Sequence, residues 1–356
     1  MTKRLDYIDV AKGLGMLTII WGHIMYSGIS NAIVYAFHIP LFFFLSGLVF
    51  SRQRYLSFKD FLMRRIKGLL VPYVVFSFLT WVVWASFSYI SHAPVDSYWR
   101  PLLQTIIAQG SDGYLIHNVP LWFVSCLFLV EIAYYFLSKL KDWIVIAVCV
   151  LCAIIGYLLV NRVDDFDFTA LPWSIEVALM AIPFYALGNM ALKHIGHSKM
   201  MESVKTHWVW TILIIIAASI ELYLGARYNG SASMGHAFLG KNPFVFYVTA
   251  ICGIVAFLSI CILISFIPVK SVIGKLIAYI KWFGINSFRV MAVHNPIKGV
   301  IVLVVAKLFH VSSGAINVHA GYASVAFVLT VVVTTIVVWF IGWFLQKTLK
   351  RNSLMK

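Results

Sequence analysis

Residues 143–160 read WIVIAVCVLCAIIGYLLV, and this stretch contains no charged side chain. A helix that crosses the hydrocarbon core of a bilayer needs about 17–25 mostly apolar residues. Lipid offers no hydrogen-bond partner to the backbone, so a spanning segment bonds to itself and forms a helix rather than a lone strand. The stretch therefore predicts a transmembrane helix.

Ten runs of this kind follow one another along the chain. They cover residues 5–26, 32–50, 69–90, 120–138, 143–160, 172–192, 208–225, 243–267, 282–308 and 320–344. With 62% hydrophobic and 12% charged residues, the composition is far from that of soluble domains. We expect an all-α, polytopic integral membrane protein of about ten transmembrane helices, with residues 1–356 forming one domain.

The basic residues between the runs are distributed unevenly. If the N-terminus is inside, the inner segments hold twenty Lys and Arg residues, and the outer loops hold only Arg100, Arg162, Arg227 and Lys241. This imbalance follows the positive-inside rule and predicts that both chain ends are cytoplasmic. The net charge of +15 therefore indicates topology, and we expect no nucleic-acid partner.

The five cysteines lie within apolar runs. Cys149 and Cys152 form a CxxC pair, but no second pair or histidine cluster accompanies it. The pattern favours packing over redox chemistry, and we expect no metal site.

Ionisable side chains interrupt the first run. Lys12 and His23 are eleven residues apart, which places them within about 20° of one helix face, with roughly 16 Å of rise between them. Asp9 shares this face, three residues before Lys12. Ionisable residues inside a membrane indicate a functional site, and a buried imidazole suits proton transfer. The alternative is that Lys12 reaches the interface and His23 bonds a neighbouring helix.

Two more histidines are expected at the depth of His23. His23 and His38 are equally far from the turn between the first two runs, so a hairpin places them at one level. His294 lies about 18 Å into the ninth run, at a comparable depth. Pro40 loosens the helix beside His38 and frees backbone carbonyls that other groups must satisfy. A structural role for His38 is the alternative, and we assign no role to the other eight histidines.

Other cations lie on both sides of His294 and in one inner segment. Arg289 and Lys298 are about one turn from His294, and their alternative role is pairing with Glu131, Glu176 or Glu221. The segment 51–68 carries six cations: Arg52, Arg54, Lys59, Arg64, Arg65 and Lys67. Such clusters suit phosphates, but they also serve topology and attract anionic lipid.

Seven stretches occur together in this order. They read YIDVAKG at 7–13, WGH at 21–23, FHIPLFFFLSG at 37–47, LLVPY at 69–73, LWF at 121–123, PFYALG at 183–188 and GINS at 284–287. This text resembles the membrane-bound acyltransferase-3 family, and within it the fucose 4-O-acetylase-like branch that includes enzymes modifying cell-surface polysaccharides.

The resemblance implies transfer of an acetyl group from cytoplasmic acetyl-CoA to a hydroxyl of a sugar or polysaccharide. It implies His23 as the base or the transient acyl carrier. We expect His38, His294 or Asn286 to orient the imidazole or stabilise the oxyanion. Location in a bacterial inner membrane, contact with membrane lipid and a homo-oligomer also fit this family.

For the donor, the resemblance implies Lys12, Arg64, Arg65 and Lys67. Lys12 stands where the family has an arginine, so the charge is kept but the bidentate fork is lost. The family's two arginines three residues apart are altered as well, because Gly68 follows Arg65 at that spacing. Arg64 and Lys67 share the spacing instead.

Two alternatives remain at this point. A polysaccharide exporter or proton-coupled transporter also carries cations near the membrane midplane and Pro-interrupted helices. An acyltransferase that uses another donor, such as succinyl-CoA, is the second. The acetyl-transfer reading predicts a continuous cavity from residues 52–67 to His23, lined by Lys12 and by residues near Asn286. It also predicts an opening near the outer loops 91–119 and 226–242.

Overall fold

A computed structural model describes residues 5–92, 94–110, 113–163 and 171–353 of the chain. Its helices are α1 Asp6–Ile24, α2 Gly28–Leu48, η1 Arg52–Arg54, α3 Phe58–Arg65, η2 Ile66–Leu70, α4 Val71–Ile90, α5 Arg100–Ile107, η3 Val119–Leu121, α6 Trp122–Leu137, α7 Asp142–Val163, η5 Pro172–Ser174, α8 Ile175–His194, α9 His197–Thr206, α10 Trp208–Asn229, η6 Met234–His236, α11 Pro243–Ser265, α12 Val272–Ile285, α13 Ser287–Leu308, α14 Ser313–Val318 and α15 Ala320–Ser353. These ranges contain no strand. Lys3, Arg4 and Lys356 of the charge count lie outside the described residues.

Nine helices in the described ranges are long and apolar enough to cross a membrane. They correspond to the second to tenth predicted runs, so the all-α, polytopic prediction is confirmed. The first run forms α1, whose 19 residues rise about 28 Å. Asp6, Asp9 and Lys12 lower its hydropathy, which keeps it out of the nine. Because Tyr7 and Ile20 are fully buried, α1 nevertheless lies inside the bundle.

Two predicted boundaries are corrected. The third run begins earlier than residue 69, because α3, η2 and α4 form one helix from Phe58 to Ile90, with a wide π turn at Ile66–Leu70. The ninth run is broken, since Asn286 separates α12 from α13. The Asn286 side chain donates to the Trp282 carbonyl oxygen (2.9 Å), one turn back in α12. Local side-chain bonding of this kind competes with continuation of the helix.

Close packing between helices depends on small residues. On α2 and α8, a Cβ at Gly47 would overlap the carbonyl of Tyr185, and one at Gly188 would overlap the carbonyl of Phe44. On α1 and α12, a Cβ at Gly284 would overlap the carbonyl of Asp9. Lipid supplies no hydrophobic force between helices, so such backbone contacts are a main source of association. They hold α1, which carries Asp9, Lys12 and His23 on one face, and α2, which carries His38.

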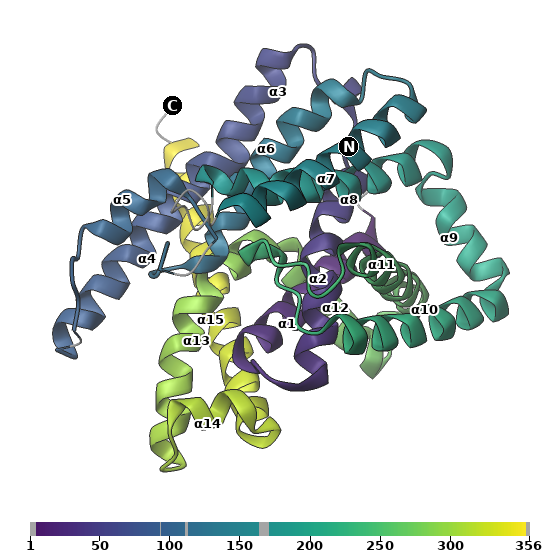
Figure 1. Ribbon diagram of the computed structural model, residues 1–356. Coiled ribbons are helices and arrows are strands. Elements are labelled where there is room, and N and C mark those ends of the chain that lie inside the picture. Colours follow the sequence, from purple (N-terminus) through teal and green to yellow (C-terminus); the bar gives the residue numbers. More distant parts are fainter. Residues whose placement is uncertain (1–4, 93, 111–112, 164–170, 354–356) are drawn as a thin grey trace.

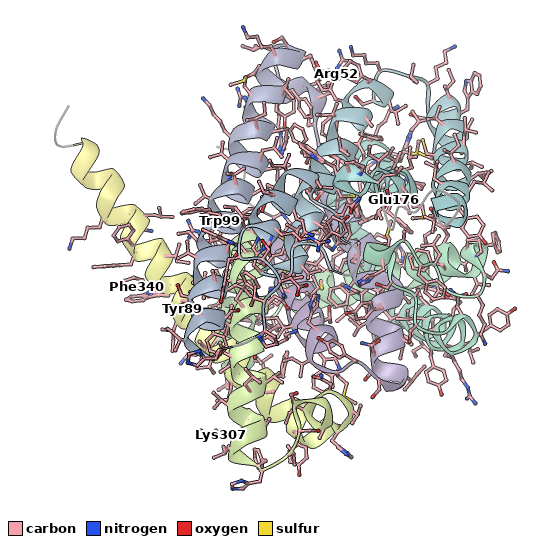
Figure 2. The ribbon with its side chains drawn as sticks, turned by 60° about the vertical axis from the view of Figure 1, so that its left-hand side comes forward. Arg52, Tyr89, Trp99, Glu176, Lys307 and Phe340 are labelled. Carbon is pink, nitrogen blue, oxygen red and sulfur yellow. The ribbon has the colours of Figure 1, made fainter. Side chains whose placement is uncertain are left out.

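The C-terminal helices form a second part of the bundle. α13 and α15 pack side by side, and the short α14 joins them at one end (Figure 1). Figure 2 shows that α15 then leans away from the other helices, with Phe340 on the projecting part and Lys307 near the far end of α13. A groove lies between α15 and the α12–α13 junction.

Substituting Gly47 with alanine tests the α2–α8 contact. We expect a loss of about 1–3 kcal/mol, the usual effect of overpacking, seen as a lower thermal unfolding midpoint in detergent. Gly299→Ala on α13 is the matched control, because no atom lies within 4 Å of its added Cβ. There alanine favours the helix, so equal midpoints for the two variants would contradict the packing.

Candidate functional site

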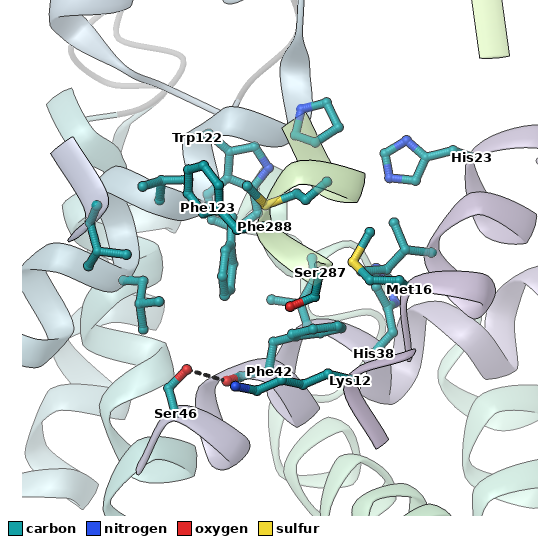
Figure 3. Close-up of a pocket in the computed structure, with 17 residues that line it drawn as sticks. Lys12, Met16, His23, His38, Phe42, Ser46, Trp122, Phe123, Ser287 and Phe288 are labelled. Carbon is teal, nitrogen blue, oxygen red and sulfur yellow. Dashed lines mark hydrogen bonds between the residues drawn. The ribbon is translucent and has the colours of Figure 1, made fainter. Parts of the chain in front are cut away.

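A cavity of about 180 Å³ lies among α1, α2, η2, α6 and α13. It is lined by Lys12, Met16, Ile19, His23, His38, Ile39, Phe42, Ser46, Leu69, Pro120, Trp122, Phe123, Val124, Leu127, Ser287, Phe288 and Met291. Figure 3 shows Lys12 and Ser46 at the end away from His23, with Trp122 and Phe123 across the cavity. Most of the wall is apolar, so the few polar groups decide its chemistry.

His38 presents one ring nitrogen as a base. Its Nδ1 lies 2.7 Å from the carbonyl oxygen of Val34, one turn back in α2. A carbonyl only accepts, so Nδ1 carries the proton and the neutral ring keeps its lone pair on Nε2. His38 is 2% exposed and lines the cavity. The α2 backbone therefore sets the tautomer that proton abstraction requires.

His294 repeats this arrangement on α13. Its Nδ1 donates to the carbonyl oxygens of Val290 (3.1 Å) and Met291 (2.9 Å). Its Nε2 is buried and has no hydrogen-bond partner among the described residues. Proline follows each of the two histidines at the second position, as Pro40 and Pro296. In the neutral form each ring therefore carries its proton on Nδ1 and can accept at Nε2, beside a proline-interrupted turn.

The three predicted histidines come together, as the hairpin count indicated. The rings of His23 and His294 are 5.3 Å apart between centroids and nearly perpendicular at 81°. His38 and the Asn295 side chain are neighbours of His23. His23 and His38 face the cavity, whereas His294 is not among its lining residues. The geometry makes His23 the central ring, with His294 behind it.

Lys12 marks the other end of the cavity. It acts electrostatically on Glu131 of α6, and Glu131 pairs with Arg65 at 3.1 Å. Arg65 also donates to the hydroxyl of Tyr55 and lies over that ring. Because Glu131 is only 4% exposed, this is a buried ion pair, and removing one partner of such a pair typically costs about 3–5 kcal/mol.

The other donor-side cations lie outside the cavity. Arg64 is exposed and pairs with Asp60 at 2.8 Å, one turn back in α3. Lys67 is exposed on η2, and two residues later Leu69 lines the cavity. The π turn therefore places a surface cation close in sequence to the cavity wall, as π turns at functional sites often do.

Asn286 does not reach the histidines. It accepts from Arg289 (3.0 Å) and lines a second groove that adjoins the cavity at Phe288. The single continuous cavity expected from the sequence is thus replaced by two spaces that share the Phe288 side chain. The alternative role of Arg289 and Lys298, pairing with a glutamate, is not found among the described residues. Arg289 pairs with none of the three glutamates, and Lys298 donates to the hydroxyl of Tyr26 (3.1 Å).

Two residues before α6 were missed by the sequence reasoning. Pro296 has no N–H, so the carbonyl of Ala292 loses its helical partner, and the Asn118 side chain donates to it at 2.6 Å. The neighbouring His117 is 3% exposed, and neither ring nitrogen has a hydrogen-bond partner among the described residues. Pro296 inside a run was the available signal, because it demanded a donor from another element.

Comparison with known proteins found one match. The family model described as an acyltransferase domain, acyltransferase 3, matches residues 5–343. No curated protein and no solved structure matches the chain. The matched range includes every side chain that lines the cavity.

His117 gives a test by pH. Burial lowers its pKa from the ordinary value of 6.5 to about 4, so between these values the unfolded chain binds a proton that the folded protein does not. Stability is therefore unaffected above about pH 6.5 and falls as the pH decreases towards 4, by roughly 2 kcal/mol at pH 5. His117→Phe should remove this part of the acid sensitivity in thermal unfolding, measured in detergent at pH 7.5 and pH 5.

The exposed His207 supplies the control for this measurement. His207→Phe should keep the wild-type difference between the two pH values. If His117→Phe keeps it as well, His117 is not held neutral in the folded protein.

Proposed function

The chain belongs to the acyltransferase family matched over residues 5–343, so its general activity is acyl transfer in a membrane, and from this premise we propose that it is a sugar O-acetyltransferase. The donor is cytoplasmic acetyl-CoA, and the acceptor is a hydroxyl of a cell-surface or lipid-linked glycan. The location is a bacterial inner membrane. This proposal follows the fucose 4-O-acetylase-like resemblance of the sequence.

One observation carries the proposal. His23 and His38 line one small, mostly apolar cavity that also holds a lysine at its other end. A base beside a reacting hydroxyl and a cation towards the donor side are what acyl transfer from a CoA thioester requires. An apolar wall excludes water, which would otherwise hydrolyse the thioester.

The transfer step uses the histidines as proton carriers. The acceptor oxygen attacks the thioester carbonyl carbon while its proton passes to His23. The tetrahedral intermediate then collapses, the carbon–sulfur bond breaks, and the His23 imidazolium returns the proton to the CoA thiolate. His294, next to His23, stabilises the imidazolium with its unpaired Nε2. His38 holds a second acceptor at the cavity wall to orient the incoming hydroxyl.

The donor is recognised from the inner side. Arg64 and Lys67 are exposed there and meet the CoA phosphates through charge-assisted hydrogen bonds. Arg65 acts differently, because its ion pair with Glu131 commits its charge to the protein. It holds Glu131 near Lys12, so that Lys12 stays oriented towards the thioester end of the donor. The family match favours this chemistry over an exporter or transporter.

His23→Ala should lower the rate of acetyl transfer by about 10²–10⁴-fold, the usual contribution of a positioned base. The rate is measured as CoA released from acetyl-CoA by purified protein with a glycan acceptor. His207→Ala, which changes an exposed histidine outside the cavity, should keep the wild-type rate. Wild-type transfer by His23→Ala would refute the base. A higher rate with succinyl-CoA than with acetyl-CoA would show that the donor is a different acyl-CoA.

Neutralising Arg64 and Lys67 together, as Arg64→Gln and Lys67→Gln, should raise the KM for acetyl-CoA and leave kcat nearly unchanged. Phosphate contacts are alike in the ground and transition states, so their loss is a loss of uniform binding. The double change Lys199→Gln and Lys205→Gln on α9 removes the same charge from another exposed inner surface. An equal rise in KM there would show a general charge effect and not a donor site.

A further inference from the structure

The groove next to the histidine cavity has its own composition. It has a volume of about 770 Å³ and lies between η2, the α12–α13 junction and α15. Arg289, Asn286 and Gln346 give it polar groups, and Trp282, Trp339 and Trp343 form its aromatic wall. A polar patch framed by tryptophans, in a chain that spans a membrane, is typical of the level of the lipid head groups.

Arg289 is the cation of this groove. Its hydrogen bond is to Asn286 (3.0 Å), and it forms no ion pair with any carboxylate in the described ranges. It lies in the first turn of α13, a helix long enough to cross the membrane alone. A half-buried cation at a membrane boundary favours an anionic partner, and the described part of the protein supplies none.

A second, apolar groove continues from the first. It has a volume of about 500 Å³ and is lined by Tyr279, Trp282, Thr335, Ile336 and Trp339. Trp282 and Trp339 belong to both grooves. The two hydroxyls in its wall, of Tyr279 and Thr335, bond each other at 2.6 Å. These two hydroxyls are therefore paired with each other, and the rest of the lining is aromatic or aliphatic.

The two grooves share Trp282 and Trp339 and together form one double groove, whose α15 wall is exposed on the outside of the bundle. Ile336 and Trp339 are 60% exposed, and Phe340 is 54% exposed on the part of α15 that leans away from the bundle (Figure 2). Lys347 lies over the ring of Trp343 at 5.1 Å, the pairing of an aromatic ring and a cation found at membrane interfaces. The opening is therefore lateral, towards lipid.

We propose that this double groove binds a lipid that carries a phosphate head group, from the leaflet on the inner side. Its phosphate accepts charge-assisted hydrogen bonds from Arg289, and its hydrocarbon chain lies along Trp282, Ile336 and Trp339. Charge and shape agree on this occupant, because the cation lies at one end and the apolar wall at the other.

The site goes beyond the proposed transfer chemistry. Phe288 lines both the groove and the histidine cavity, so a head group bound at Arg289 lies one side chain away from the cavity. The phosphate of the bound lipid also supplies the anionic partner that Arg289 lacks in the described part of the protein. Lipid binding is therefore measurable without turnover, and it stands or falls separately from acetyl transfer.

The experiment is a titration of purified, delipidated protein in detergent, with bound lipid counted by native mass spectrometry. The probes are dioleoyl phosphatidic acid and dioleoylglycerol, which lacks the phosphate. We expect Arg289→Gln to weaken phosphatidic acid binding by roughly 10- to 100-fold, the range for lost charge-assisted hydrogen bonds, with dioleoylglycerol binding unchanged. Lys307→Gln, at the other end of α13, removes the same charge and should bind as wild type does.

A second variant keeps the test decisive if Arg289→Gln does not fold. An added Cβ at Gly342 lies 3.3 Å from Nη1 of Arg289, so Gly342→Leu fills the head-group space while the charge stays. It should weaken phosphatidic acid binding with an unchanged thermal midpoint. Equal affinity in wild type and in the variants that fold overturns the proposal. Displacement of phosphatidic acid by excess CoA, with loss of CoA binding in Arg289→Gln, overturns it in favour of a soluble phosphate donor.

Discussion

Inside a membrane, every backbone carbonyl that loses its helical partner must find another donor, because lipid offers none. Pro296 creates this demand on α13, and Asn118 meets it at the Ala292 carbonyl. That bond ties the segment before α6 to the helix that carries His294. His294 itself donates to carbonyls one turn back, which fixes its tautomer. Hydrogen bonds to backbone carbonyls of α13 therefore hold both the segment before α6 and the ring of His294 in place.

A second constraint, close packing between backbones, holds the helices around the site. The walls of the cavity belong to helices that touch through glycine, at Gly47 and Gly188 for α2 and α8 and at Gly13 and Gly284 for α1 and α12. Backbones in such contact leave no room for a side chain, so a shift of either helix would open a gap. His23 lies on α1 and His38 on α2, so each of these contacts fixes the helix of one ring against a neighbouring helix. All four glycines lie in stretches that carry the family resemblance, which gives those stretches a packing role.

The sequence predicted what depends on hydropathy and on helical rise. The spans follow from apolar length, and the meeting of His23, His38 and His294 follows from counting residues from a turn and from a helix start. The sequence did not reveal which neighbours a side chain meets. Asn286 was expected beside His23, but the break between α12 and α13 turns it towards Arg289. Arg65 was expected on a phosphate, but Glu131 of α6, 66 positions further along the chain, takes its charge. Contacts of this kind depend on how helices rotate against each other, which periodicity does not encode.

The cations in the bundle differ in what balances them, and this difference separates structure from binding. Arg65 is balanced by a buried carboxylate, so its charge stabilises the fold and is not offered to a ligand. Lys298 donates a hydrogen bond to the hydroxyl of Tyr26 and lies over the ring of the same residue. Arg289 has one amide oxygen, which satisfies a hydrogen bond but leaves the charge uncompensated. A half-buried, uncompensated cation attracts an anion more strongly than the same group fully in water. The groove at Arg289 and the cavity at His23 therefore differ in kind: the groove selects by charge at the membrane surface, whereas the cavity, on the other side of Phe288, has neutral bases and little water.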